Sequence, residues 1–140
     1  MSVYFDASLI VSLFVKDAQT DRAESYLNRH QPTAALSDFV ALEVASAVNL
    51  RVRTKQLTAP QAESVLAAFD IWRSRSADML SLIAGDISTA DNFMRRLNLP
   101  LRAPDALHIA IAQRHSLPLA TFDAQMAASA QILGVTLAPT

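Results

Sequence analysis

The sequence predicts a single α/β domain, a three-layer sandwich in which helices flank a short, mainly parallel sheet of about four to five strands. Three observations support this fold class. Short β-prone runs alternate along the chain with segments whose apolar residues recur at helical spacing. Residues 106–112 are apolar nearly all round, which is typical of a helix buried in a core. The chain has 140 residues, 51% of them hydrophobic, which is enough to form a sizeable core.

Each expected element rests on a local pattern. Strands are predicted where β-branched, aromatic or other apolar residues form short runs, and helices where apolar residues lie three and four apart. The expected order is a strand at 3–5, a helix that starts near residue 8, a helix over about 20–29, a strand at 34–36, helices over about 39–55 and 58–75, a strand at 79–83, helices over about 87–97 and 104–115, a strand at 117–122, a helix at 124–133 and a last strand at 135–137.

Capping residues set several of these boundaries. Pro104 fits the first helical position, because it lacks an N–H and its φ is already near the helical value. Ser37–Asp38, Asp86 and Asp123 each precede a helical pattern and are expected to be N-caps. Gly134 fits the position just after the last helix. No repeat or linker interrupts this order, so the chain is expected to form one domain over residues 1–140.

The composition excludes several classes of protein. There is no cysteine, which excludes disulfides, thiolate metal sites and cysteine catalysis and is consistent with a reducing compartment. No basic segment precedes an apolar one at the N-terminus, and no apolar run is long enough to predict a membrane span. The expected location is therefore the cytoplasm. The net charge of −1 argues neither for nor against a nucleic-acid partner.

Three carboxylates are expected to meet at one edge of the sheet. Asp6 and Asp123 each follow a predicted strand, and Asp105 lies in the first turn of the apolar helix. In a parallel sheet the carboxyl ends of the strands and the starts of the following helices share one edge. Glu43, which interrupts an apolar run in the long third helix, can join them from behind. The sequence thus predicts a cluster of four acids.

Each acid also has a simpler interpretation. Asp105 could merely start its helix, where the backbone N–H groups and the helix dipole favour a negative charge. Glu43 could point to solvent from the flank of its helix. Ser8, two residues after Asp6, could cap the first helix, support the site, or do both. These interpretations stay open at the level of the sequence.

A cluster of four acids has a definite chemistry. Carboxylates that crowd together repel each other unless cations lie between them, and oxygen ligands of this kind favour Mg²⁺ or Mn²⁺ over Zn²⁺. Such ions polarise a phosphoryl oxygen and lower the pKa of a bound water, which is the chemistry of phosphodiester hydrolysis. We therefore expect Asp6, Glu43, Asp105 and Asp123 to be metal ligands and catalytic residues.

The motifs resemble those of PIN-domain nucleases, in particular the toxin subunits of bacterial toxin–antitoxin modules. The resemblance covers the whole chain. It rests on four features in order: the first strand that ends in Asp6 with Ser8 two residues on, Glu43 in the third helix, Pro104-Asp105-Ala106-Leu107 at the start of an apolar helix, and Thr121-Phe122-Asp123 after the fourth predicted strand. One departure is His108 in that apolar helix, which we interpret as a buried or rim histidine with satisfied hydrogen bonds rather than a ligand.

The resemblance implies an activity and partners. It implies a PIN-like fold and a metal-dependent ribonuclease, with Asp6, Glu43, Asp105 and Asp123 as the acidic site and Thr121 or Ser8 in support. It also implies a homodimer and a cognate antitoxin protein that blocks the cleft.

Arginine supplies ten of the twelve cations, and arginines recur in close pairs, including Arg95 with Arg96. Because arginine suits phosphate contacts, Arg95, Arg96 and Arg102 are the candidates for RNA binding, although solvated helix faces explain any single pair more simply.

Two other classes fit part of the pattern. A haloacid-dehalogenase-like phosphatase also begins with a strand and an aspartate, but its motif requires a second aspartate where this chain has Ser8. A non-catalytic binding module on the same fold would keep the core and lose acids, whereas all four acids are present.

Overall fold

The computed structural model describes all 140 residues as one α/β domain around a four-stranded parallel sheet. The order of the strands in the sheet is β3-β2-β1-β4. The strands are β1 (Ser2–Phe5), β2 (Thr33–Ser37), β3 (Ala77–Leu80) and β4 (Leu119–Ala120). The predicted fold class, with four parallel strands between layers of helices, is confirmed.

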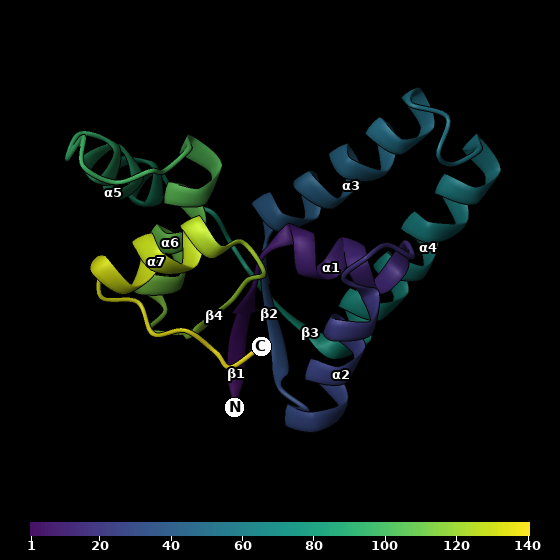
Figure 1. Ribbon diagram of the computed structural model, residues 1–140, viewed down its shortest axis with the longest axis horizontal. Helices are drawn as coiled ribbons and strands as arrows, with labels where there is room; N and C mark the ends of the chain where they lie inside the picture. Colours follow the sequence, from purple (N-terminus) through teal and green to yellow (C-terminus); the bar gives the residue numbers. More distant parts are fainter.

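Seven helices cover the sheet. Figure 1 shows α1 to α4 on one side of the central strands and α5 to α7 on the other. Because all four strands run in the same direction, their carboxyl ends meet at one edge, and α1 and α3 start there directly after β1 and β2. The helices are α1 (Ala7–Phe14), α2 (Thr20–His30), α3 (Asp38–Arg53), α4 (Ala59–Ser76), α5 (Ala84–Met94), α6 (Ala103–Arg114) and α7 (Ala124–Ile132).

The core is centred on β1 and α6. Val3, Tyr4 and Phe5 of β1 are fully buried. Every residue from 106 to 112 in α6 is buried, as the continuous apolar pattern of this segment predicts. α6 leads into β4, which runs parallel to β1, so α6 starts toward the carboxyl ends of the strands. Asp105 lies in its first turn. No helix is both long enough and apolar enough to cross a membrane.

Several predicted boundaries are wrong at the edges of the sheet. β3 starts at Ala77, directly after α4, and ends at Leu80, because only four of its residues have partners on β2. β4 has two residues, since Pro118 lacks an N–H and the chain turns toward α7 after Ala120. The predicted last strand is reduced to one parallel bridge between Leu119 and Leu137.

The structure decides one open question about helix caps and corrects one predicted cap. Asp6, rather than Ser8, is the N-cap of α1, because its carboxylate accepts a hydrogen bond from the N–H of Leu9. Asp86 lies in the first turn of α5 instead of capping it, and its carboxylate accepts from the N–H of Ile83 at the N-cap position. Ser37 and Asp123 are N-caps as predicted, and Gly134 has the positive φ expected after a helix.

Candidate active site at the carboxyl ends of the strands

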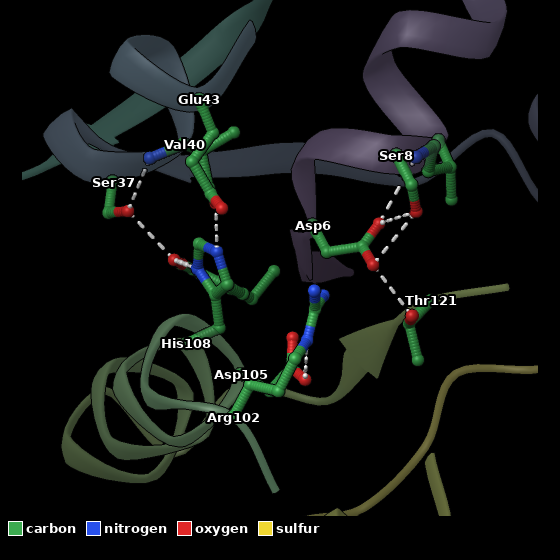
Figure 2. Close-up of polar contacts among 11 residues, drawn as sticks. Asp6, Ser8, Ser37, Val40, Glu43, Arg102, Asp105, His108 and Thr121 are labelled. Atoms are coloured by element: carbon green, nitrogen blue, oxygen red, sulfur yellow. Dashed lines mark hydrogen bonds and ion pairs between the residues drawn. The ribbon is translucent and has the colours of Figure 1, made fainter. Parts of the chain in front are cut away.

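Asp6 is held where β1 passes into α1. Its carboxylate accepts hydrogen bonds from the N–H of Leu9 at 3.1 Å and the hydroxyl of Thr121 at 2.6 Å, and the Ser8 hydroxyl lies 3.0 Å from each of its oxygens. The donors come from α1 and from the segment after β4, two parts of the chain that are far apart in sequence (Figure 2). Ser8 and Thr121 therefore support Asp6 in the structure.

Hydrogen bonds stabilise the charge of Asp6, and no lysine or arginine pairs with it. Asp6 is 5% exposed, and none of the ion pairs of the protein includes it. Burial raises the pKa of Asp6 above its ordinary value, and the hydrogen bonds from Thr121, Leu9 and Ser8 offset only part of that effect. A buried carboxylate without a cationic side chain is costly, and a cation that binds from solution would relieve the cost.

Glu43 is the end of a buried chain of hydrogen bonds. The Nε2 of His108 contacts Glu43, Nδ1 of His108 lies 2.8 Å from the hydroxyl of Tyr4, and that hydroxyl lies 2.7 Å from Oγ of Ser37 (Figure 2). One arrangement of protons satisfies every group. Ser37 Oγ accepts from the N–H of Val40 and donates to Tyr4, Tyr4 donates to Nδ1, and the Nε2–H donates to Glu43. Glu43 thus points into the site.

Burial strengthens this chain. His108 is 3% exposed and Tyr4 is fully buried, and burial raises the pKa of the Tyr4 hydroxyl above its ordinary value. His108 is a satisfied buried histidine, as the sequence predicts. What the sequence did not predict is that its partner is Glu43, because the two residues are 65 positions apart and lie on different helices.

Asp105 lies in the first turn of α6 with a side chain that is 15% exposed. Its nearest cation is Arg102, whose Nε lies 3.6 Å from the Asp105 carboxylate and whose own side chain is 79% exposed. Figure 2 shows Asp6 turned toward Ser8 and Thr121, Glu43 turned toward His108, and the Arg102 side chain beside Asp105. Of the three candidate RNA-binding arginines, Arg102 is therefore the one that lies beside an acid of the candidate site.

Asp123 is arranged differently from the other three acids. It is exposed, and its carboxylate accepts hydrogen bonds from the N–H groups of Gln125 at 2.9 Å and Met126 at 3.1 Å, which caps α7. Its own N–H donates to Thr121 Oγ1, the same oxygen that donates to Asp6. Asp123 is therefore connected to Asp6 through Thr121.

The four acids are not assembled into a metal-binding cluster. No three His, Asp or Glu side chains are grouped closely enough to hold a metal ion. Asp6 is turned toward Thr121, Glu43 toward His108, and Asp123 toward the N–H groups at the start of α7. The donor set nevertheless fits a hard divalent cation, because it consists of carboxylate and hydroxyl oxygens and because Asp6 has no cation of its own.

Arg95 and Arg96 directly follow α5. Arg95 is bound to Asp91 one turn earlier, at 2.8 Å, and both side chains are exposed. Arg96 is exposed.

The sequence matches the PIN domain family model over residues 3–132, so the chain belongs to the PIN domain family. No curated protein sequence matches the chain.

Several solved structures have a similar fold, and three of them cover almost the whole chain. The Mycobacterium tuberculosis toxin VapC20, described as cleaving the sarcin–ricin loop, is 18% identical with a TM-score of 0.73, and the match covers 99% of each chain. FitAcB from Neisseria gonorrhoeae is 19% identical with a TM-score of 0.69 over 99% of this chain and 97% of its own. VapBC2 from Rickettsia felis, bound to a DNA fragment of its promoter, is 18% identical with a TM-score of 0.69. This match covers 99% of this chain and 98% of the VapBC2 chain.

Proposed function

We propose that this PIN domain is a divalent-metal-dependent ribonuclease that hydrolyses RNA phosphodiester bonds and acts as the toxin of a toxin–antitoxin pair. The observation that carries the proposal is the buried Asp6 carboxylate, which has hydrogen-bond donors but no cation. Glu43 contacts His108, which lies one turn after Asp105 on α6. The site therefore has the oxygen ligands for a cation and lacks a side chain that would neutralise Asp6.

The similar structures support the partners in this proposal. VapC20 is described as a toxin that cleaves the sarcin–ricin loop, and another similar structure, from Klebsiella pneumoniae, is described as a toxin–antitoxin complex. By analogy, this chain would act on RNA, bind a cognate antitoxin protein, form a homodimer and function in the cytoplasm.

The residues of the site have distinct proposed roles. Asp6, Glu43 and Asp105 would hold Mg²⁺ or Mn²⁺, with Asp123 as the fourth candidate ligand. A bound ion of this kind polarises the phosphoryl oxygen and activates a water. Ser8 and Thr121 orient the carboxylate of Asp6, and His108 fixes the direction of Glu43. Arg102 would contact a phosphate of the substrate, and Arg95 and Arg96 would bind more distant phosphates.

The test is hydrolysis of single-stranded RNA by the purified protein, freed of any partner, with Mg²⁺ or Mn²⁺. We expect cleavage that stops in excess EDTA. Asp6→Asn should lower the rate by at least about a hundredfold, because even the outer partners of a metal site are worth ten- to a hundredfold. Asp70→Asn is the matched control, since Asp70 is an exposed acid on α4 that pairs only with Arg73.

Three results would contradict the proposal. Hydrolysis that continues undiminished in EDTA would exclude the metal mechanism. RNA binding without hydrolysis, in wild type and Asp6→Asn alike, would instead support a non-catalytic binding module. Hydrolysis of a small phosphomonoester but not of RNA would support a phosphatase.

A further inference from the structure

A hollow of about 340 Å³ lies beside the acids, between α1, α3 and the segment that joins α1 to α2. Ser8 and Glu43, which belong to the candidate active site, form part of its wall. The rest of the wall has polar side chains, one cation, one further acid and one aromatic ring. The residues that matter here are Ser8, Ser12, Asp17, Glu43, Arg51 and Phe122.

Arg51 is the cation of this hollow. Glu43, Ala47 and Arg51 lie four residues apart on α3, so they share one face of the helix, and all three line the hollow. Glu43 and Arg51 are separated by about 12 Å along the helix axis, at 1.5 Å per residue. The Arg51 side chain is 22% exposed, so its guanidinium is partly withdrawn from water.

The contacts of Arg51 leave most of its donors free. Nη1 donates to the carbonyl of Ala47 at 3.4 Å, which is its only hydrogen bond. Nη2 lies 3.8 Å from the carboxylate of Asp17, too far for a hydrogen bond. Asp17 does not depend on Arg51, because its carboxylate accepts from the N–H of Gln19 at 2.8 Å and from the hydroxyl of Ser12 at 3.1 Å.

We propose that this hollow is a nucleotide subsite and that Arg51 binds an RNA phosphate next to the one that is cleaved. The proposal rests on the proposed ribonuclease function. A strand whose scissile phosphate lies at Asp6 and Glu43 can place a neighbouring nucleotide in this hollow, because Ser8 and Glu43 line it. The hollow offers three features for a nucleotide. The planar guanidinium of Arg51 suits a phosphate, the side-chain hydroxyl and amide groups suit a sugar or a base, and Phe122 supplies an apolar wall.

The experiment compares Arg51→Gln with Arg53→Gln. Arg53 lies on the same helix, is exposed and contacts Asn49 instead of the hollow, so it is a matched control. Binding of a short fluorescein-labelled single-stranded RNA is measured by anisotropy in EDTA over a range of salt concentrations, and a gel checks that the RNA stays intact. A phosphate contact on a single strand contributes about 0.7 to the slope of log affinity against log salt. We expect Arg51→Gln to lower this slope by about 0.7 and Arg53→Gln to leave it unchanged.

Asp17→Asn is expected to raise the affinity for RNA, whereas Arg51→Gln is expected to lower it. It removes a negative charge beside the proposed phosphate and frees Nη2 of Arg51, so RNA should bind more tightly than to wild type. If Arg51 only holds the segment around Asp17 in place, Arg51→Gln and Asp17→Asn will both lower the melting temperature and neither will change the salt slope. That result, or equal slopes for Arg51→Gln and Arg53→Gln, would overturn the subsite.

The two proposals fail separately. If the wild type hydrolyses RNA with metal while the slopes of the two arginine variants are equal, the subsite is wrong and the ribonuclease stands. If Arg51→Gln alone flattens the slope but no metal-dependent hydrolysis occurs, RNA binds at the hollow and the proposed enzymatic function is wrong.

Discussion

Two buried aspartates of this protein are stabilised in opposite ways. Asp86 is 1% exposed, and its carboxylate is bound by Arg114 at 2.7 Å and 3.0 Å and by the N–H of Ile83. Asp6 is 5% exposed and is bound by two hydroxyls and one N–H, without any cation. Burial raises the pKa of both carboxyls. At Asp86 the hydrogen bonds and the charge of Arg114 overcome burial and lower the pKa, whereas at Asp6 the pKa stays raised.

The difference separates an acid that supports the fold from an acid that is available to a ligand. Arg114 also donates to the carbonyl of Ser81, so the Asp86–Arg114 pair joins α6 to α5 and to the segment after β3. Asp6 joins β1 and α1 to the segment after β4, but its negative charge is left uncompensated. A carboxylate of this kind costs stability in the free protein and gains it back when a cation binds.

The largest expected effect is on folding stability. Asp86→Asn should lower the free energy of unfolding by about 3 kcal/mol, because it leaves the Arg114 guanidinium half-buried without its counter-charge. Asp6→Asn should leave the metal-free stability unchanged or raise it by about 1 kcal/mol, since asparagine is as good an N-cap as aspartate and the buried charge is removed. Urea unfolding in EDTA measures both.

Asp70→Asn on the surface is the control for this comparison and should have little effect, because exposed ion pairs contribute at most about 1 kcal/mol. If Asp6→Asn is destabilised as much as Asp86→Asn, the charge of Asp6 is structural and the distinction between the two aspartates is wrong.

The next effect concerns metal binding. At a free Mn²⁺ concentration about a hundred times its dissociation constant, the wild type should gain about 2.7 kcal/mol of stability. Asp105→Asn should lose much of this gain while its stability in EDTA stays equal to wild type or rises by about 1 kcal/mol. Asp86→Asn should keep the full gain despite its lower stability.

Thermal melts of these proteins with and without Mn²⁺ test whether Asp105 contributes to metal binding. An Asp105→Asn variant that melts below the wild type in EDTA and shows the same shift with Mn²⁺ would identify Asp105 as a residue that only starts α6. The clustered-acid site would then be wrong.

The fold could be predicted because its signals are local. The alternation of strands and helices, the apolar run of α6 and the N-caps at Ser37 and Asp123 depend on residues a few positions apart. The failures are at positions where distant pairing decides the outcome. β3 is limited by its register with β2, and residues 135–137 make only one bridge, between Leu119 and Leu137.

Which acids form the site stays a prediction, and the contacts of these acids could not be predicted. Asp6 was chosen because it follows a predicted strand, Asp105 because it starts an apolar helix, and Glu43 because it interrupts an apolar run. The chain from Ser37 through Tyr4 and His108 to Glu43 joins residues up to 104 positions apart, and no local pattern specifies it. Asp86 was interpreted as a simple cap because its partner Arg114 is 28 positions away.

The smallest expected effect is the pH dependence of the Asp86–Arg114 pair. The pKa of Asp86 is lowered in the folded protein, so the unfolded chain binds the proton more tightly. The stabilisation by Asp86 is therefore fully present above the unfolded aspartate pKa of about 3.9, and it is lost as the pH falls through the folded pKa. The difference in unfolding free energy between wild type and Asp86→Asn should be constant from about pH 7 to pH 5 and should then shrink by about 1.4 kcal/mol for each unit by which the pKa is lowered. Urea titrations of both proteins at several pH values measure this difference.

Asp70→Asn, measured in the same way, reports the contribution of an exposed acid. A difference that persists unchanged into acid would mean that Asp86 stabilises the fold through its shape and hydrogen bonds, and that its charge opposite Arg114 contributes nothing.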